Sequence, residues 1–111
     1  MYHYKANSIY GYYEKKVDVY TDKNLKNMPY AQAGVRIEKF QGTNIYVLVS
    51  YETDILEIIG DRINILFSPS YSRSTIKHVI AFLREYVPTV SYQTVKQAYF
   101  DNKDYVLIKR D

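Results

Sequence analysis

The chain has 111 residues, of which 47% are apolar and 16% aromatic, and it has no cysteine. This length and composition predict one compact domain, 1–111, with a single core, and they exclude a disordered tail, a disulfide scaffold and a thiolate metal site. The net charge of +3 arises in residues 61–111, which carry eight basic and five acidic groups, and it excludes mimicry of DNA by dense carboxylates. No apolar run approaches the roughly 20 residues of a membrane span, and the N-terminus lacks the apolar centre of a signal peptide, so we expect a cytoplasmic protein.

The N-terminal third, residues 1–33, is expected to be the least regular part. Strand-type residues over 8–21 surround Gly11, which indicates a bulge or bend, and residues 22–32 are rich in turn formers. Tyrosine is abundant, with 14 copies. Most of these rings are expected to fill half-buried strand positions, and a few are expected to contact a partner.

Residues 34–67 are expected to form two β-hairpins. Alternating hydropathy predicts a half-buried strand over 34–40, and an apolar run over 45–53 predicts a central strand after a Gln-Gly turn. Strands over 55–59 and 62–67 flank Gly60 and Asp61 in the second hairpin. Pro69 is expected to end the last of these strands because proline has no amide hydrogen for the ladder.

A long helix is predicted after Pro69 within a helical part that spans 72–100. Four apolar residues recur at helical spacing and form one buried stripe: Ile76, Val79, Ile80 and Leu83. Ser72 or Ser74 is placed to cap the first turn, which accounts for the serine-rich stretch, and Pro88 ends the helix.

A shorter helix is expected over 91–100, and a last strand over 105–109. The order of strands, then helices, then a strand is typical of an α+β fold. We therefore predict a mainly antiparallel sheet of about five strands, with one long and one short helix packed on one face.

The spacing of polar residues does not predict a catalytic or metal site. Ser74, His78 and Glu85 would lie in a line along one helix and would not converge on a substrate, as a hydrolase requires. His78 is placed opposite the apolar stripe, as a solvated side chain beside Lys77. His3 and His78 have no carboxylate cluster near them in sequence, so we expect no bound metal and no cofactor.

Two nucleic-acid functions remain open as alternatives. Residues 82–99 loosely resemble a helix-turn-helix, with Lys96 and Gln97 on its second helix, which is compatible with a regulator that binds DNA or RNA. A small metal-independent ribonuclease needs only Arg, Lys, Tyr or His side chains, all of which are present.

Protein binding is the third possibility. Phe82 lies off the apolar stripe, and a ring exposed among the charges of Lys77 and Glu85 would suit an interface anchor. The alternative is that Phe82 packs beneath the N-terminal segment. Both placements are left open by the sequence.

Two stretches, SYETDILEI (50–58) and YSRSTIKHVIAFLREY (71–86), resemble a pattern found in small proteins of phages, plasmids and integrated elements of Gram-positive bacteria. The pattern is roughly S-Y-x-T-x-I, a short hairpin, then Y-S-x-T-T-x-x-H-x-x-x-F-L, and Ser74 replaces its usual threonine. The resemblance implies that His78 pairs with Tyr51 or Tyr71 and fastens the hairpin to the helix.

Such proteins often act by binding host machinery, and inhibitors of defence nucleases, including anti-CRISPR proteins, form one such class. The resemblance therefore implies a non-enzymatic inhibitor that binds a Cas9-type nuclease or its guide-RNA complex. The expected contact face is the helix 73–86. Its leading residues are Lys77, Phe82 and Arg84, and the complete set adds Arg73, His78 and Lys96.

Overall fold

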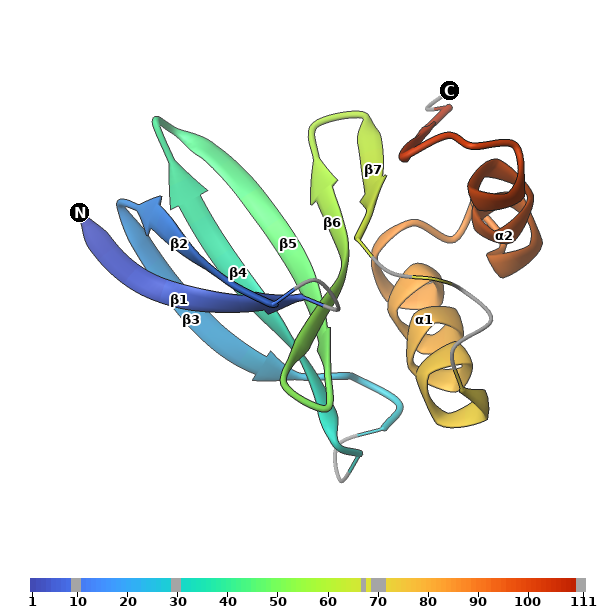
Figure 1. The fold of residues 1–111 in the computed structure, drawn as a ribbon, viewed down its shortest axis with the longest axis horizontal. Coiled ribbons are helices and arrows are strands. Elements are labelled where there is room, and N and C mark those ends of the chain that lie inside the picture. The colour runs from blue at the N-terminus through green and yellow to red at the C-terminus, as the bar shows by residue number, and fades with distance from the viewer. Residues whose placement is uncertain (9–10, 29–30, 67, 69–71, 110–111) are drawn as a thin grey trace.

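The computed structural model describes residues 1–8, 11–28, 31–66, 68 and 72–109, and these ranges form an α+β fold (Figure 1). The strands are β1 (Tyr2–Ser8), β2 (Gly11–Val17), β3 (Val19–Asn24), β4 (Ala33–Phe40), β5 (Thr43–Ser50), β6 (Thr53–Ile59), β7 (Arg62–Ile65) and β8 (Tyr105–Leu107). The helices are α1 (Arg73–Tyr86) and α2 (Tyr92–Phe100). Neither helix is long and apolar enough to cross a membrane.

Six strands form one antiparallel sheet in the order β3-β4-β5-β6-β7-β8. Both helices pack on one face of this sheet, and the main core lies between the sheet and the helices. The core includes Leu48, Leu56 and Ile63 of the sheet, Val79 and Phe82 of α1, and Val95 of α2. The predicted fold class and helix placement are thus confirmed. The main sheet has six strands where about five were expected, and two further strands of the described residues form a separate sheet.

The second sheet is the β1–β2 hairpin, which lies across the other face of the large sheet (Figure 1). Ala6 and Val17 of this hairpin are buried but lie outside the main core, as do Ile45 and Val47 of β5. The molecule therefore has three layers, and the large sheet is covered on both faces over β4 to β6.

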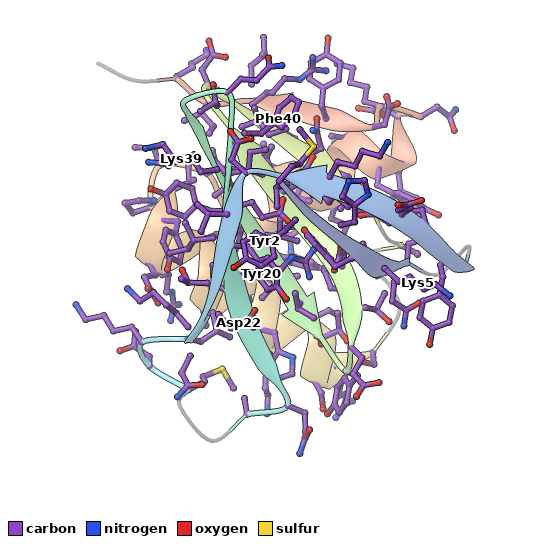
Figure 2. The ribbon with its side chains drawn as sticks, turned by 90° about the vertical axis from the view of Figure 1, so that its left-hand side faces the viewer. Tyr2, Lys5, Tyr20, Asp22, Lys39 and Phe40 are labelled. Carbon is purple, nitrogen blue, oxygen red and sulfur yellow. The ribbon has the colours of Figure 1, made fainter. Side chains whose placement is uncertain are left out.

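The prediction of an irregular N-terminal third is wrong, because this segment supplies three strands. Its inward-facing positions mix the buried Ala6 and Val17 with tyrosines and Lys15, so the hydropathy does not alternate as in an ordinary strand. The Tyr2 and Tyr4 rings lie 5.5 Å and 4.8 Å from that of Tyr20, centroid to centroid, and Figure 2 shows Tyr2 and Tyr20 side by side where the hairpin meets β3. Aromatic packing replaces aliphatic packing here.

The turns that connect β4 to β5, β5 to β6 and β6 to β7 contain residues with left-handed backbone. Gln41 and Gly42 have φ of 51° and 80°, as predicted for the first hairpin, and Gly60, with φ of 58°, begins the predicted β6–β7 turn. The strand expected over 45–53 instead ends at Ser50, because Tyr51 and Glu52 adopt φ of 49° and 66° and form a further turn. The sequence carries no signal for this turn, since positive φ is uncommon for residues other than glycine.

The predicted helix ends are confirmed. The Ser72 hydroxyl accepts a hydrogen bond from the Thr75 amide at 3.1 Å, which selects Ser72 over Ser74 as the cap of α1, and α1 ends before Pro88. Ser91 caps α2 in the same way, and the last strand is shorter than expected, ending at residue 107. Pro69 and Tyr71 lie outside the described residues.

Candidate functional site

The predicted interface anchor on α1 is not exposed. Phe82 is 0% exposed and packs in the main core, with its ring 5.2 Å from that of Tyr86. The buried face of α1 consists of Thr75, His78, Val79, Phe82 and Leu83, whereas Ile76 and Ile80 are only half-buried. The apolar stripe read from the sequence is therefore rotated, because two of the buried positions on this helix are polar.

His78 is likewise buried rather than solvated, with 3% of its surface exposed. Its Nδ1 lies 2.8 Å from the Ser50 hydroxyl, and its ring lies 5.7 Å from that of Tyr51. Of the two partners expected for His78, Tyr51 is in ring contact with it, whereas Tyr71 lies outside the described residues. Burial lowers the pKa of His78, which favours the neutral imidazole at this junction.

The residues that carry the resemblance meet at this junction between the β5–β6 turn and α1. Ser72 donates to the Thr75 hydroxyl at 3.0 Å, and the Thr75 and Ser50 hydroxyls lie 3.4 Å apart. Ser50, Thr75 and His78 are all at most 3% exposed, so solvent and substrates do not reach them. These residues therefore hold β5 and α1 together, and they do not form a contact surface.

Three of the predicted site residues, Arg73, Lys77 and Arg84, are exposed on α1. At about 100° per residue they lie within about 40° of one another around the helix axis. Lys96 is half-buried on α2 and belongs to a different element. The structure thus groups three of the six predicted residues into one basic stripe.

A buried ionic network lies between the β1–β2 hairpin and the large sheet, and the sequence did not predict it. Lys15 reaches inward from β2, with Nζ 2.7 Å from Glu38 Oε1 and 2.8 Å from Glu57 Oε2. Glu38 is 0% exposed, so its negative charge depends on partners within the protein. One lysine therefore binds carboxylates of β4 and β6 together.

Arg36 completes the network from β4. Its Nε lies 2.8 Å from Glu38 Oε2 and its Nη2 lies 2.7 Å from Asp54 Oδ2, an oxygen that also accepts from the Tyr13 hydroxyl at 2.9 Å. The guanidinium stacks 4.8 Å from the centroid of the Tyr4 ring. Hairpin and sheet are thus joined by charge-assisted bonds in addition to the apolar contact.

A β-bulge makes this network possible. Asp54 and Glu57 are three residues apart, and regular strand alternation would put them on opposite faces of β6. In β6, however, Asp54 pairs with Val49 and Leu56 pairs with Leu48, which leaves Ile55 as an extra residue. Both carboxylates therefore point toward the hairpin, while Ile55 and Leu56 are both buried in the main core.

The network contains three carboxylates and two cations, so it has an excess negative charge when fully ionised. Burial, followed by the charges of Glu57 and Asp54, raises the pKa of Glu38 to about 8. Lys15 and Arg36 oppose this shift, but each is shared with a second carboxylate. Uptake of one proton by Glu38 removes the buried charge and also balances the network, so burial and the two neighbouring carboxylates act in the same direction.

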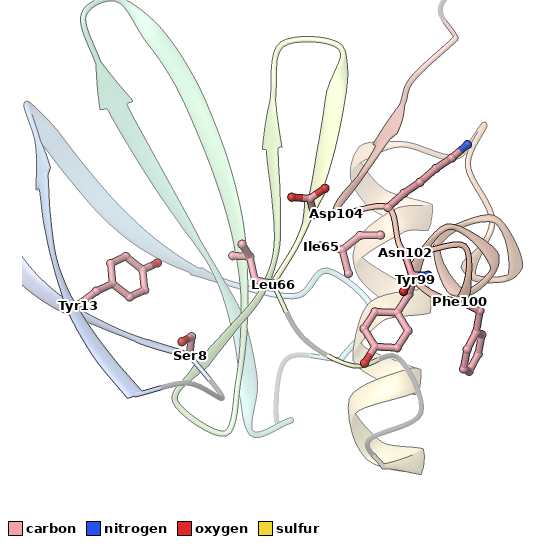
Figure 3. A pocket seen from close by; sticks show the side chains of 9 residues that line it. Ser8, Tyr13, Ile65, Leu66, Tyr99, Phe100, Asn102 and Asp104 are labelled. Carbon is pink, nitrogen blue, oxygen red and sulfur yellow. The ribbon is translucent and has the colours of Figure 1, made fainter.

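Two adjoining hollows of the described surface lie near the C-terminal end of the fold. A cavity of about 530 Å³ separates the hairpin from α2 and is lined by Tyr13 on one side and by Tyr99 and Phe100 on the other (Figure 3). A groove of about 830 Å³ runs between α2 and β8. The turn residues 102–104 line both.

Large apolar side chains are exposed around these two hollows. Phe100 is 54% exposed, Tyr105 39% and Leu107 62%, and Tyr105 is covered on one side by the Arg62 guanidinium, 3.9 Å from its ring centroid. The sequence predicted the last strand but not that it would be an edge, because strand order cannot be read from hydropathy alone. This end of the fold is the candidate binding surface.

Among the described residues, no three His, Asp or Glu side chains are grouped in a way that could hold a metal ion. Comparison with known proteins finds no matching family model, no matching curated sequence and no matching solved structure.

Proposed function

We propose that this protein is a non-enzymatic binding protein that inhibits a host defence nuclease, with the α2–β8 end as its contact surface. The observation that carries the binding function is the exposure of Phe100, Tyr105 and Leu107 around two adjoining hollows. Exposed aromatic and aliphatic side chains beside a groove are typical of interface anchors.

The arrangement of the ionisable groups supports binding rather than catalysis. Lys15, Arg36, Glu38, Asp54 and Glu57 neutralise one another under the hairpin, where they bind one strand to another. A catalytic acid or base has to reach a substrate, whereas Glu38 is completely buried. These groups therefore serve the fold.

The inhibitor part of the proposal rests on the resemblance of residues 50–58 and 71–86 to small proteins of mobile elements, and a Cas9-type nuclease is the specific target we propose. The basic stripe of α1 (Arg73, Lys77 and Arg84) adds a surface for the guide RNA or for an acidic region of the nuclease. The partner is thus a protein, with or without its RNA, in the bacterial cytoplasm.

The proposal is tested by capture of partners from a Gram-positive lysate with tagged protein, before and after nuclease treatment. A large protein that remains bound after the treatment supports the proposal, and its loss of DNA cleavage activity in the presence of this protein supports the inhibitor function. Capture of nucleic acid alone, abolished by the treatment, contradicts it.

The basic stripe favours a second candidate, a regulator that binds nucleic acid through α1. Affinity for DNA or RNA would then fall steeply with salt, and the double substitution Lys77→Ala and Arg84→Ala would weaken binding to all sequences alike. Binding that is insensitive to both changes excludes this function.

A further inference from the structure

The large sheet has an open edge at β8, where main-chain groups are left without a neighbouring strand. β8 pairs with β7 on one side only, and its other side borders the groove beside α2. An unpaired strand edge presents main-chain donors and acceptors to any segment that can lie alongside it. The question is which groups of β8 face outward.

The ladder between β7 and β8 answers this. The Ile65 amide donates to the Asp104 carbonyl at 2.8 Å, and the Ile108 amide donates to the Asp61 carbonyl at 2.6 Å. In an antiparallel pair, alternate residues bond to the same neighbour. The main-chain groups of residues 104, 106 and 108 therefore point to β7, and those of Tyr105 and Leu107 point away from it.

Among the described residues, no backbone partner is recorded for the amides of Tyr105 and Leu107. Their two N–H and two C=O groups border the groove of about 830 Å³, whose opposite wall is formed by Gln93, Gln97 and Ala98 of α2. A strand edge facing a helix across a groove is the arrangement that accepts an extended peptide as an additional strand.

The charges near the edge indicate what kind of segment fits. On the face of β8 away from the helices, Leu107 lies opposite Arg62, and Lys109 follows at the next position of the same alternation. A second copy of this chain paired edge to edge would bring these cations close to their own copies. The groove toward α2 is lined by Ala98 and also by Gln93, Gln97, Asp101 and Asp104. A partner strand with acidic side chains on the face of Arg62 and Lys109, and small apolar side chains toward Ala98, keeps its own charges away from these two carboxylates.

We infer that β8 is an acceptor edge that binds an extended acidic–apolar segment of a partner protein as a seventh strand, in the groove between β8 and α2. This inference rests on the proposed protein-binding function and adds its mode of binding and the chemistry of the partner. The three-residue length of β8 limits the contact to a short segment.

The test uses the full-length ¹⁵N-labelled protein and an end-blocked hexapeptide of alternating valine and glutamate. We expect the peptide to slow hydrogen exchange of the Tyr105 and Leu107 amides, and the counterpart with lysine in place of glutamate to bind at least about tenfold more weakly. Absence of protection at both amides overturns the inference, as does equal binding of the two peptides.

Two substitutions at one position separate main-chain pairing from side-chain contact. Leu107→Pro removes an outward amide and leaves the bonds to β7 in place, and proline is tolerated at such edge positions. Leu107→Ala removes the side chain and keeps the amide. We expect Leu107→Pro to abolish peptide binding. Leu107→Ala loses an exposed anchor side chain, so it should bind the peptide more weakly, but the amides of residues 105 and 107 should still be protected at saturating peptide; both folds are verified by their spectra.

The same pair distinguishes this inference from the proposed function. If a lysate partner binds the wild type and Leu107→Pro equally, protein binding stands and the acceptor edge is wrong. If the peptide protects the two amides but no lysate protein is captured, the edge stands and the proposed function fails. A dimer of the wild type that Leu107→Pro converts to a monomer assigns the edge to a second copy and overturns the inferred partner.

Discussion

The Ser50 hydroxyl lies 2.8 Å from Nδ1 of His78, and this contact joins the last residue of β5 to the second turn of α1. Both residues are at most 3% exposed. The junction therefore contains a titratable group that is kept neutral by burial, and the stability of the protein depends on its protonation.

Replacement of His78 by asparagine should alter the pH dependence of stability. Because burial lowers the pKa of His78 below its usual 6.5, the unfolded chain takes up the proton first, and the wild type loses stability as the pH falls below about 6.5. His78→Asn cannot lose stability in this way. Urea unfolding at pH 7.5 and 5.5 should show the wild type's advantage over the variant shrinking at the lower pH; an unchanged advantage contradicts a buried neutral imidazole.

Replacement of Glu38 by glutamine should have the opposite pH dependence. The folded pKa of about 8 exceeds the unfolded value of 4.5, so the stability associated with protonated Glu38 is complete below 4.5 and is lost as the pH rises to about 8. Glu38→Gln keeps the shape and removes the titration. The variant should gain on the wild type between pH 5 and pH 8.5 in urea unfolding, and a constant difference over this range would show that Glu38 has an ordinary pKa.

Replacement of Lys15 by methionine should release the hairpin from the sheet. It leaves Glu57 without its cation and the Glu38 carboxyl without its donor, and removal of one partner from a buried ion pair costs about 3–5 kcal/mol. Hydrogen exchange in β1 and β2 should become faster, while α1 stays protected. The matched control is Lys16→Met, which removes the exposed lysine next in sequence and should change the free energy of unfolding by less than about 0.5 kcal/mol. Equal effects of the two substitutions would refute the network's role.

Replacement of Phe82 by alanine should destabilise the whole fold. The side chain is completely buried in the main core, so truncation should cost about 3–5 kcal/mol in the free energy of unfolding. Phe100→Ala is the matched control, because that ring is 54% exposed and its loss should cost little stability. Thermal melts of both variants check this. A small change in melting temperature for Phe82→Ala would contradict the burial of Phe82 and would indicate that its ring lies on the surface.

The parts of the fold that the sequence predicted are those set by local interactions. The cap at Ser72, the helix end before Pro88 and the turn at Gly60 each depend on residues within about one turn of each other. The parts that were missed depend on distant partners or on unusual backbone. The turn at Tyr51 lacks glycine, and so it resembled the continuation of a strand.

The ionic network is the clearest example of information that hydropathy does not contain. Lys15 and Arg36 look like solvent-facing residues of half-buried strands, and their partner Glu57 is 42 residues from Lys15. The bulge at Ile55 adds a change of face that simple alternation excludes. The charged residues of these strands are visible in the sequence, but which of them pair with one another follows only from the strand order.

The strand order has a consequence for how the chain folds. From β3 to β7, each strand pairs with the next one along the sequence, so this part forms by closing short loops, which is fast. β8 is different, because both helices lie between it and β7 along the chain, so this pairing closes a much longer loop. Refolding should therefore bring β3–β7 together early, and the last strand should be the final addition to the sheet.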